Sequence, residues 1–144
     1  MGTRSLTFVY DGEEAIINMY RQYDGYPTGH GAELAEFLGS FEAITNGIRV
    51  GDERKIANGM GCLAAQLVAN FKVGAGQFYL YPTSATDCGQ DYEYHVYSDQ
   101  RGVCVRITDR GCNMFGLTMS DKNEALFDGT VAEFTEYCTE KVED

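Results

Sequence analysis

The dipeptide Asp11-Gly12 separates two runs of residues typical of β-strands, and this arrangement constrains the fold more than any other local feature. The run from Thr3 to Tyr10 alternates between two sides, with Leu6, Phe8 and Tyr10 on one and Ser5, Thr7 and Val9 on the other. The run from Ala15 to Gln22 is rich in isoleucine, methionine and tyrosine. Because Asp-Gly favours a two-residue hairpin turn, the chain is predicted to begin with an antiparallel β-hairpin.

Helical and strand-like patterns then alternate along the chain. Helices are expected over Leu34 to Gly39, over Glu53 to Lys72 or from nearer Gly61, and after a capping box over Thr130 to Glu133. Strands are expected over Phe78 to Pro82, Asp91 to Ser98, Val103 to Ile107, Asn113 to Met119 and, briefly, Ala125 to Phe127, and a turn at Asn46-Gly47. The order ββααββββα predicts a single α+β domain over residues 1–144. Its antiparallel or mixed β-sheet would have about six strands, with three helices packed mainly on one face.

Composition excludes several classes of protein. The net charge of −11, with eight acidic residues and two lysines after residue 120, disfavours binding to a nucleic-acid polymer. No apolar run approaches the ~20 residues that span a bilayer, and the first residues lack the pattern of a signal peptide. The five cysteines include no C-x-x-C pair, which favours reduced thiols in a cytoplasmic protein. No membrane association, metal or cofactor is expected.

The segment from Tyr20 to Gly31 is the most site-like part of the sequence. Gly29 and Gly31 could bring backbone N–H groups close to an anion just before a helix N-terminus. Arg21 could bind a phosphate or carboxylate through two hydrogen bonds, while Tyr23 and Tyr26 could stack on a base. The alternative interpretation is an ordered turn, because Asp24-Gly25 and Tyr26-Pro27 are turn dipeptides and His30 could cap the helix.

Other residues offer weaker signals. His30 could serve as a general base oriented by Asp24, whereas His95 alternates with Glu93 and Tyr97 and is interpreted as a polar surface residue. The glycines of Asn58 to Cys62 are expected to let a helix pack tightly on the sheet. Ten tyrosines and no tryptophan indicate an amphipathic surface, either a stacking platform or an interface between copies of the chain.

Several of these residues together resemble a family of small proteins from phages and large DNA viruses. The matching motifs cover about two-thirds of the chain and are Met1 to Thr7, Tyr20 to Gln22, Asp24 to Pro27, Gly29 to Gly31, Glu33 to Ala35, Phe37-Leu38, Asn58 to Leu67, Phe78 to Pro82 and Asp91-Tyr92 with Tyr94. The resemblance implies a viral protein in the host cytosol. Small oligomeric phage proteins can sequester the nucleotide signals of bacterial immunity, and the resemblance suggests that setting here.

The sequence therefore predicts a non-enzymatic protein that binds a small anionic, nucleotide-like ligand, as a possible homo-oligomer. The residues expected to contribute are Arg21, Tyr23, Tyr26, Gly29, His30 and Gly31, with Arg4 or Arg106 from neighbouring strands. Two alternatives stay open. One is a nucleotide hydrolase or phosphodiesterase that uses His30, and the other is an acidic inhibitor that binds a host factor through the C-terminal helix.

Overall fold

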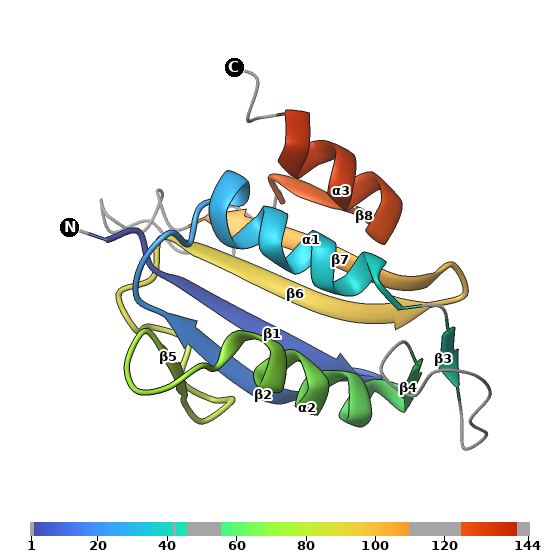
Figure 1. Cartoon of the computed structure of the whole chain (residues 1–144), viewed down its shortest axis with the longest axis horizontal. Coiled ribbons are helices and arrows are strands. Elements are labelled where there is room, and N and C mark those ends of the chain that lie inside the picture. Colours follow the sequence, from blue (N-terminus) through green and yellow to red (C-terminus); the bar gives the residue numbers. More distant parts are fainter. Residues whose placement is uncertain (1, 42, 46–55, 110–124, 141–144) are drawn as a thin grey trace.

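A computed structural model describes residues 2–41, 43–45, 56–109 and 125–140 of the chain. Six strands form one mixed sheet in the order β5-β2-β1-β6-β7-β8, and two short strands form a parallel pair, β3-β4 (Figure 1). The strands are β1 (Ser5–Asp11), β2 (Glu14–Arg21), β3 (Ala43–Thr45), β4 (Ile56–Asn58), β5 (Phe78–Leu80), β6 (Tyr92–Asp99), β7 (Gly102–Asp109) and β8 (Phe127–Thr130). The helices are α1 (Ala32–Gly39), which follows a π-helical turn over Pro27–Gly31, α2 (Gly59–Phe71) and α3 (Val131–Glu140).

The N-terminal strand β1 lies inside the sheet, not at its edge. It pairs antiparallel with β2 in the predicted hairpin, whose two turn residues are Gly12 and Glu13, one residue later than the predicted Asp11-Gly12. It pairs parallel with β6 on its other side. The remaining pairs, β2 with β5, β6 with β7 and β7 with β8, are antiparallel. The predicted α+β class with a mixed sheet is therefore confirmed.

One face of the sheet carries the main hydrophobic core. The alternation in β1 and β6 sends Val9, Tyr94 and Val96 to this face, where Val105 and Ile107 of β7 continue the apolar surface. The three helices cover it with buried side chains that include Leu34, Leu38, Leu63, Leu67, Phe71, Phe134 and Cys138. Figure 1 views the sheet from this side, so the predicted packing of three helices mainly on one face is confirmed.

The opposite face, called the outer face here, is the side that carries Leu6, Phe8, Tyr10, Tyr20, Glu93, His95, Arg106 and Thr108. Leu6, Phe8 and Tyr20 form a second, smaller hydrophobic cluster there. The segment after β5 crosses one end of this face, where Asn18 Nδ2 donates to the carbonyl oxygens of Pro82 and Ala85 at 3.2 and 2.8 Å. Within the described residues no helix covers the other end, near the β1–β2 turn.

Some boundaries differ from those predicted. Helix α2 begins at Gly59 instead of Glu53, because strand β4 occupies residues 56–58 and Gly59 turns the chain with a φ of +84°. A side chain at Gly59 or Gly61 would meet open space, so the expected tight packing at these glycines is wrong. The strand expected over Asn113 to Met119 and the turn at Asn46-Gly47 lie outside the described residues.

The capping box before α3 is confirmed. The N–H of Thr130 donates to Glu133 Oε1 at 2.8 Å, and the N–H of Glu133 donates to Thr130 Oγ1 at 3.3 Å. These reciprocal bonds satisfy backbone donors that a helix N-terminus otherwise leaves unpaired, and they fix the point at which β8 becomes α3.

Candidate functional site

Arg21, the first residue of the predicted site, lies on the helix-covered face and is only 4% exposed. Its Nε donates to the carbonyl oxygen of Tyr23 at 2.6 Å, and its Nη1 and Nη2 donate to the Glu33 carboxylate at 2.8 and 3.4 Å. The guanidinium also stacks over the Phe78 ring, 5.0 Å from its centre. Arg21 therefore joins β2 to α1 and β5, and its charge is balanced by Glu33, whose side chain is 53% exposed at the surface.

His30 is completely buried beneath this ion pair. Its Nδ1 lies 3.1 Å from Arg21 Nη1 and its Nε2 lies 2.7 Å from Thr7 Oγ1. Because a guanidinium can only donate, Nδ1 must accept, so Nε2 carries the hydrogen and donates to Thr7. Burial, together with the Arg21 charge, lowers the pKa of His30 to about 3. The geometry gives no support to His30 as a general base, because no substrate reaches a fully buried imidazole with both nitrogens engaged.

The glycines of this segment are explained by close packing. The N–H groups of Gly29 and Gly31 donate to the carbonyl oxygen of Tyr26 at 2.9 and 3.4 Å, and that of His30 donates to Asp24 at 2.7 Å. A methyl group at Gly29 would lie 2.5 Å from the carbonyl oxygen of Asp24. The expectation that these amides face an anion is therefore not met, because they hold a compact turn together.

The remaining predicted residues are dispersed. Tyr23 and Tyr26 are exposed at the surface of the turn, at 52% and 38%. The main-chain N–H of Arg4, just before β1, donates to Asp91 Oδ2 at 3.1 Å, and its guanidinium lies beside Gly89. Arg106 lies on β7, on the outer face. The structure thus brings Arg21, His30, Gly29 and Gly31 together as structural residues and leaves Arg106 on the other side of the sheet.

A different group of polar side chains gathers on the outer face, around a hollow of about 430 Å³. The hollow lies beside the β1–β2 turn and is lined by Tyr10, Gly12, Glu13, His95, Tyr97 and Arg106. The pairing of β6 with β7 sets His95 directly beside Arg106, and Phe8 on β1 stacks on the imidazole at 5.3 Å with nearly parallel rings. Three adjacent strands therefore position one cation, one imidazole and two phenol rings around a single space.

Hydrogen bonds hold these side chains in place. Tyr10 Oη lies 2.8 Å from His95 Nδ1, and His95 Nε2 lies 3.3 Å from Glu93 Oε1. Burial raises the pKa of Tyr10, and the Glu93 carboxylate raises it further, so the phenol stays protonated at neutral pH. The hollow is thus lined by polar and aromatic side chains whose positions are fixed by hydrogen bonds, as in many small-molecule sites.

Asp128 of β8 links Tyr97 and Arg106, the other two side chains of the hollow. The hydroxyl of Tyr97 donates to Asp128 Oδ1, and Arg106 Nη1 lies 3.8 Å from Asp128 Oδ2. Burial and this carboxylate raise the pKa of Tyr97 to about 12. Arg106 is 37% exposed and lines the hollow.

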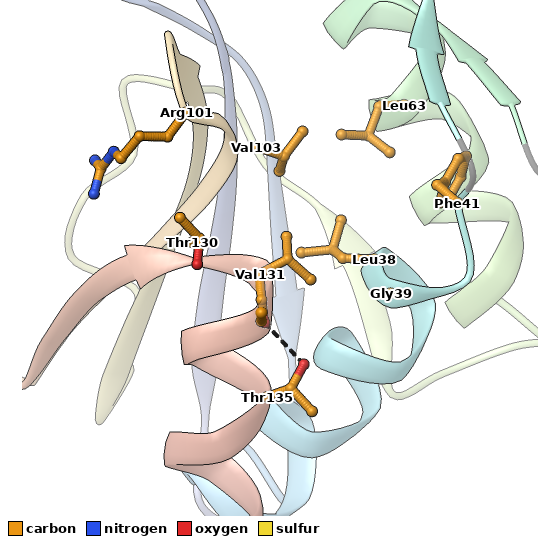
Figure 2. Close-up of a pocket in the computed structure, with 10 residues that line it drawn as sticks. Leu38, Gly39, Phe41, Leu63, Arg101, Val103, Thr130, Val131 and Thr135 are labelled. Carbon is orange, nitrogen blue, oxygen red and sulfur yellow. Dashed lines mark hydrogen bonds between the residues drawn. The ribbon is translucent and has the colours of Figure 1, made fainter.

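A larger hollow of about 660 Å³ lies between the ends of α1, α2 and β7 and the start of α3 (Figure 2). Leu38, Leu63, Val103 and Val131 converge in Figure 2, whereas Arg101 points away from them. Arg101 is held by Asp99, with Nη2 2.7 Å from Oδ2. The converging side chains make one part of this hollow apolar, Thr130 and Thr135 add hydroxyl groups, and the one arginine of the lining is already paired with Asp99.

The alternation of residues in β6 pointed to the outer-face site, but from the sequence it was interpreted only as a polar surface. Glu93, His95 and Tyr97 alternate with the apolar Tyr92, Tyr94 and Val96, which places three polar side chains on one face of one strand. Arg106 occupies the same face of the next strand. Only the register of β6 against β7 shows that these residues meet.

No protein-family model matches the chain, and neither a curated protein nor a solved structure is significantly similar to it. Three or more potential metal ligands do not come together anywhere among residues 2–41, 43–45, 56–109 and 125–140. In those same ranges, no helix combines the length and the apolar character needed to cross a bilayer. The functional argument therefore rests on the geometry of the chain itself.

Proposed function

We propose that the protein binds a small anionic, nucleotide-like ligand in the outer-face hollow and releases it unchanged. The observation that carries this proposal is the convergence of Arg106, His95, Tyr10 and Tyr97 on one space from three neighbouring strands. The ligand class is the one expected from the sequence. The site, however, centres on Arg106 and not on Arg21, whose charge Glu33 already balances.

Arg106 would supply the main attraction for the anionic group. A guanidinium can donate two parallel hydrogen bonds to a phosphate, and a charged hydrogen bond of this kind contributes about 1.5–3 kcal/mol. Asp128, 3.8 Å from Arg106, would compete with the ligand for the guanidinium. Binding would therefore replace a long ion pair within the protein by a shorter one with the ligand.

The aromatic rings and Glu13 favour a nucleotide over a simple anion. Tyr10 and Tyr97 line the same hollow as Arg106, and stacking of a base on an aromatic ring contributes about 1–3 kcal/mol. Glu13 lies at the rim in the β1–β2 turn, where its carboxylate could accept hydrogen bonds from the N–H edge of a base. An inorganic phosphate has no base to stack on these rings, so it should bind more weakly than a nucleotide.

The resemblance to phage and large-virus proteins gives such binding a biological role. A protein that holds a nucleotide signal without degrading it would lower the free concentration of that signal in the host cytosol, either as a monomer or as a homo-oligomer. The other functions expected from the sequence, a hydrolase using His30 and an acidic inhibitor acting through the C-terminal helix, stay predictions that no described contact favours.

The proposal is tested by thermal-shift screening of the purified protein against nucleotides and cyclic nucleotides, followed by chromatography of the bound ligand after denaturation. Arg106→Gln, which keeps an aliphatic stem and removes the charge, should weaken binding by about 10- to 100-fold while the unfolding temperature of the free protein stays close to wild type. Recovery of a cleaved nucleotide would overturn the non-enzymatic form of the proposal.

A matched control separates the two candidate sites. The double variant Tyr23→Ala and Tyr26→Ala removes two exposed rings from the originally predicted turn and leaves the outer face intact. It should bind the ligand as wild type does. Loss of binding in this variant, with normal binding by Arg106→Gln, would return the site to the turn.

A further inference from the structure

His95 is the middle member of a hydrogen-bonded series on the outer face that runs from Glu93 through His95 to Tyr10, at the hollow. Its two ring nitrogens contact different partners, with Nε2 3.3 Å from Glu93 Oε1 and Nδ1 2.8 Å from Tyr10 Oη. The stacked Phe8 ring fixes the plane of the imidazole. Because Tyr10 also lines the hollow, it is the end of the series that a ligand would meet.

Glu93, at the end of this series away from the hollow, accepts hydrogen bonds from its other neighbours. Glu93 Oε2 accepts a hydrogen bond from Gln90 Nε2 at 2.7 Å, and Glu93 Oε1 accepts one from Thr108 Oγ1 at 3.4 Å. A carboxylate held by such donors accepts from the imidazole as well, so the hydrogen of a neutral His95 resides on Nε2. The Nδ1 atom of the neutral ring must then be the acceptor of the Tyr10 hydroxyl.

The direction of the Tyr10 hydroxyl hydrogen therefore depends on the charge of His95. When the imidazole is neutral, Tyr10 donates its hydrogen to Nδ1 and presents only oxygen lone pairs to the hollow. When the imidazole is protonated, both ring nitrogens donate, Tyr10 accepts from Nδ1, and its own hydrogen is turned outward. An anion in the hollow would be repelled by the first arrangement and bound by the second.

We propose that anion binding in the hollow takes up one proton at His95, with the Tyr10 hydroxyl as the group that couples the proton to the ligand. This inference rests on the proposed function and adds a means of regulating it. No bond is formed or broken other than the transfer of one proton from solvent to His95 Nδ1.

The surrounding charges agree with this coupling. The titratable and charged groups around the imidazole and the hollow are Glu93 on β6, Tyr10 on β1, Glu13 in the β1–β2 turn, Tyr97 on β6, Arg106 on β7 and Asp128 on β8. Glu93 Oε1 lies 3.3 Å from His95 Nε2, and Arg106 is the cross-strand neighbour of His95 on β7. A bound anion would neutralise part of the Arg106 charge, so ligand and proton would each favour the binding of the other.

The test measures affinity between pH 5.5 and 8 with two probes that do not titrate in this range, 3′,5′-cyclic GMP and inorganic sulfate, in cationic buffers that do not compete for an anion site. Wild type should lose about tenfold in affinity for each unit that the pH rises through the range in which the proton is taken up. His95→Gln and Tyr10→Phe should each give an affinity that varies little with pH. Tyr97→Phe, which alters the hollow outside the series, should keep the wild-type slope.

Nitrogen-15 NMR of the two imidazoles provides an independent readout that a merely structural role of His95 would not change. Addition of the probe at neutral pH should shift His95 towards the protonated form, and the buried His30 should not respond and serves as internal reference. Binding with a flat pH profile, or a full slope in Tyr10→Phe, would overturn the coupling and leave the proposed function standing. Absence of binding of both probes at every pH would overturn both.

Discussion

The buried imidazole of His30 should make the protein sensitive to mild acid. In the folded chain the ring is neutral, because it accepts from the Arg21 guanidinium through Nδ1 and donates to Thr7 through Nε2. A second proton would have to occupy Nδ1, where it would face the N–H of a positively charged arginine in a site closed to bulk solvent. Unfolding removes this conflict, so acid favours the unfolded chain.

The magnitude follows from the two pKa values. The folded pKa of about 3 lies below the unfolded value of 6.5, so between these limits the unfolded state binds one more proton than the folded state. Stability is therefore fully present above pH 6.5 and falls as the pH decreases, by about 1.4 kcal/mol for each unit. From pH 7.5 to pH 4.5 the loss is about 2.7 kcal/mol, a large part of the ~5–15 kcal/mol that stabilises a typical domain.

The comparison with His30→Gln isolates this contribution, since glutamine keeps one donor and one acceptor but does not titrate. Urea unfolding, followed by circular dichroism at pH 7.5, 6.5, 5.5 and 4.5 on wild type and variant, gives the free energy of unfolding at each pH. The wild type should lose about 1.4 kcal/mol more per pH unit than the variant below pH 6. Parallel pH profiles for the two proteins would refute the assignment of His30 as a neutral, internally satisfied residue.

Three further substitutions test other parts of the structure. Gly29→Ala places a methyl group 2.5 Å from the carbonyl oxygen of Asp24 and should lower the free energy of unfolding by about 1–3 kcal/mol in the same urea assay. Glu133→Ala removes half of the capping box of α3 and should cost about 1 kcal/mol, visible as a lower thermal midpoint. Asp128→Asn removes the carboxylate that competes for Arg106 and should raise the affinity for cyclic GMP severalfold in calorimetric titration, whereas an unchanged or weaker affinity would argue against Arg106 as the anion site.

The local patterns of the sequence were sufficient for most of the fold. The first hairpin and the capping box at Thr130 depend on neighbouring residues, and both are confirmed, with the turn displaced by one residue to Gly12-Glu13. The parallel pairing of β1 with β6 depends on contacts between distant segments, which periodicity does not report. The small β3-β4 pair was not predicted because each strand has three residues, too few to show a period.

The candidate site was harder to predict for the same reason. The sequence of a glycine-rich turn is the same whether its backbone amides bind a ligand or the carbonyl groups of the turn itself. The residues that bind His30 and Arg21 inside the protein, Thr7 and Glu33, lie in other elements of the fold. His95 and Arg106 look unremarkable in the sequence because each is a single polar residue on an amphipathic strand. Their significance arises from the register of two strands.

The interior position of β1 has a consequence for how the chain folds as it is synthesised. The β1–β2 hairpin is synthesised before β6, so the edge of β1 that pairs with β6 stays unpaired until β6 has been made. The N–H of Arg4 likewise has no access to its acceptor, the Asp91 carboxylate, until 87 further residues have been added. Closing a loop of this length is slow compared with forming a hairpin. The nascent hairpin therefore has two unpaired edges until β5 is made, and the β1 edge stays unpaired until β6 follows. Such edges are where a chaperone, or a second nascent copy of the chain, would bind.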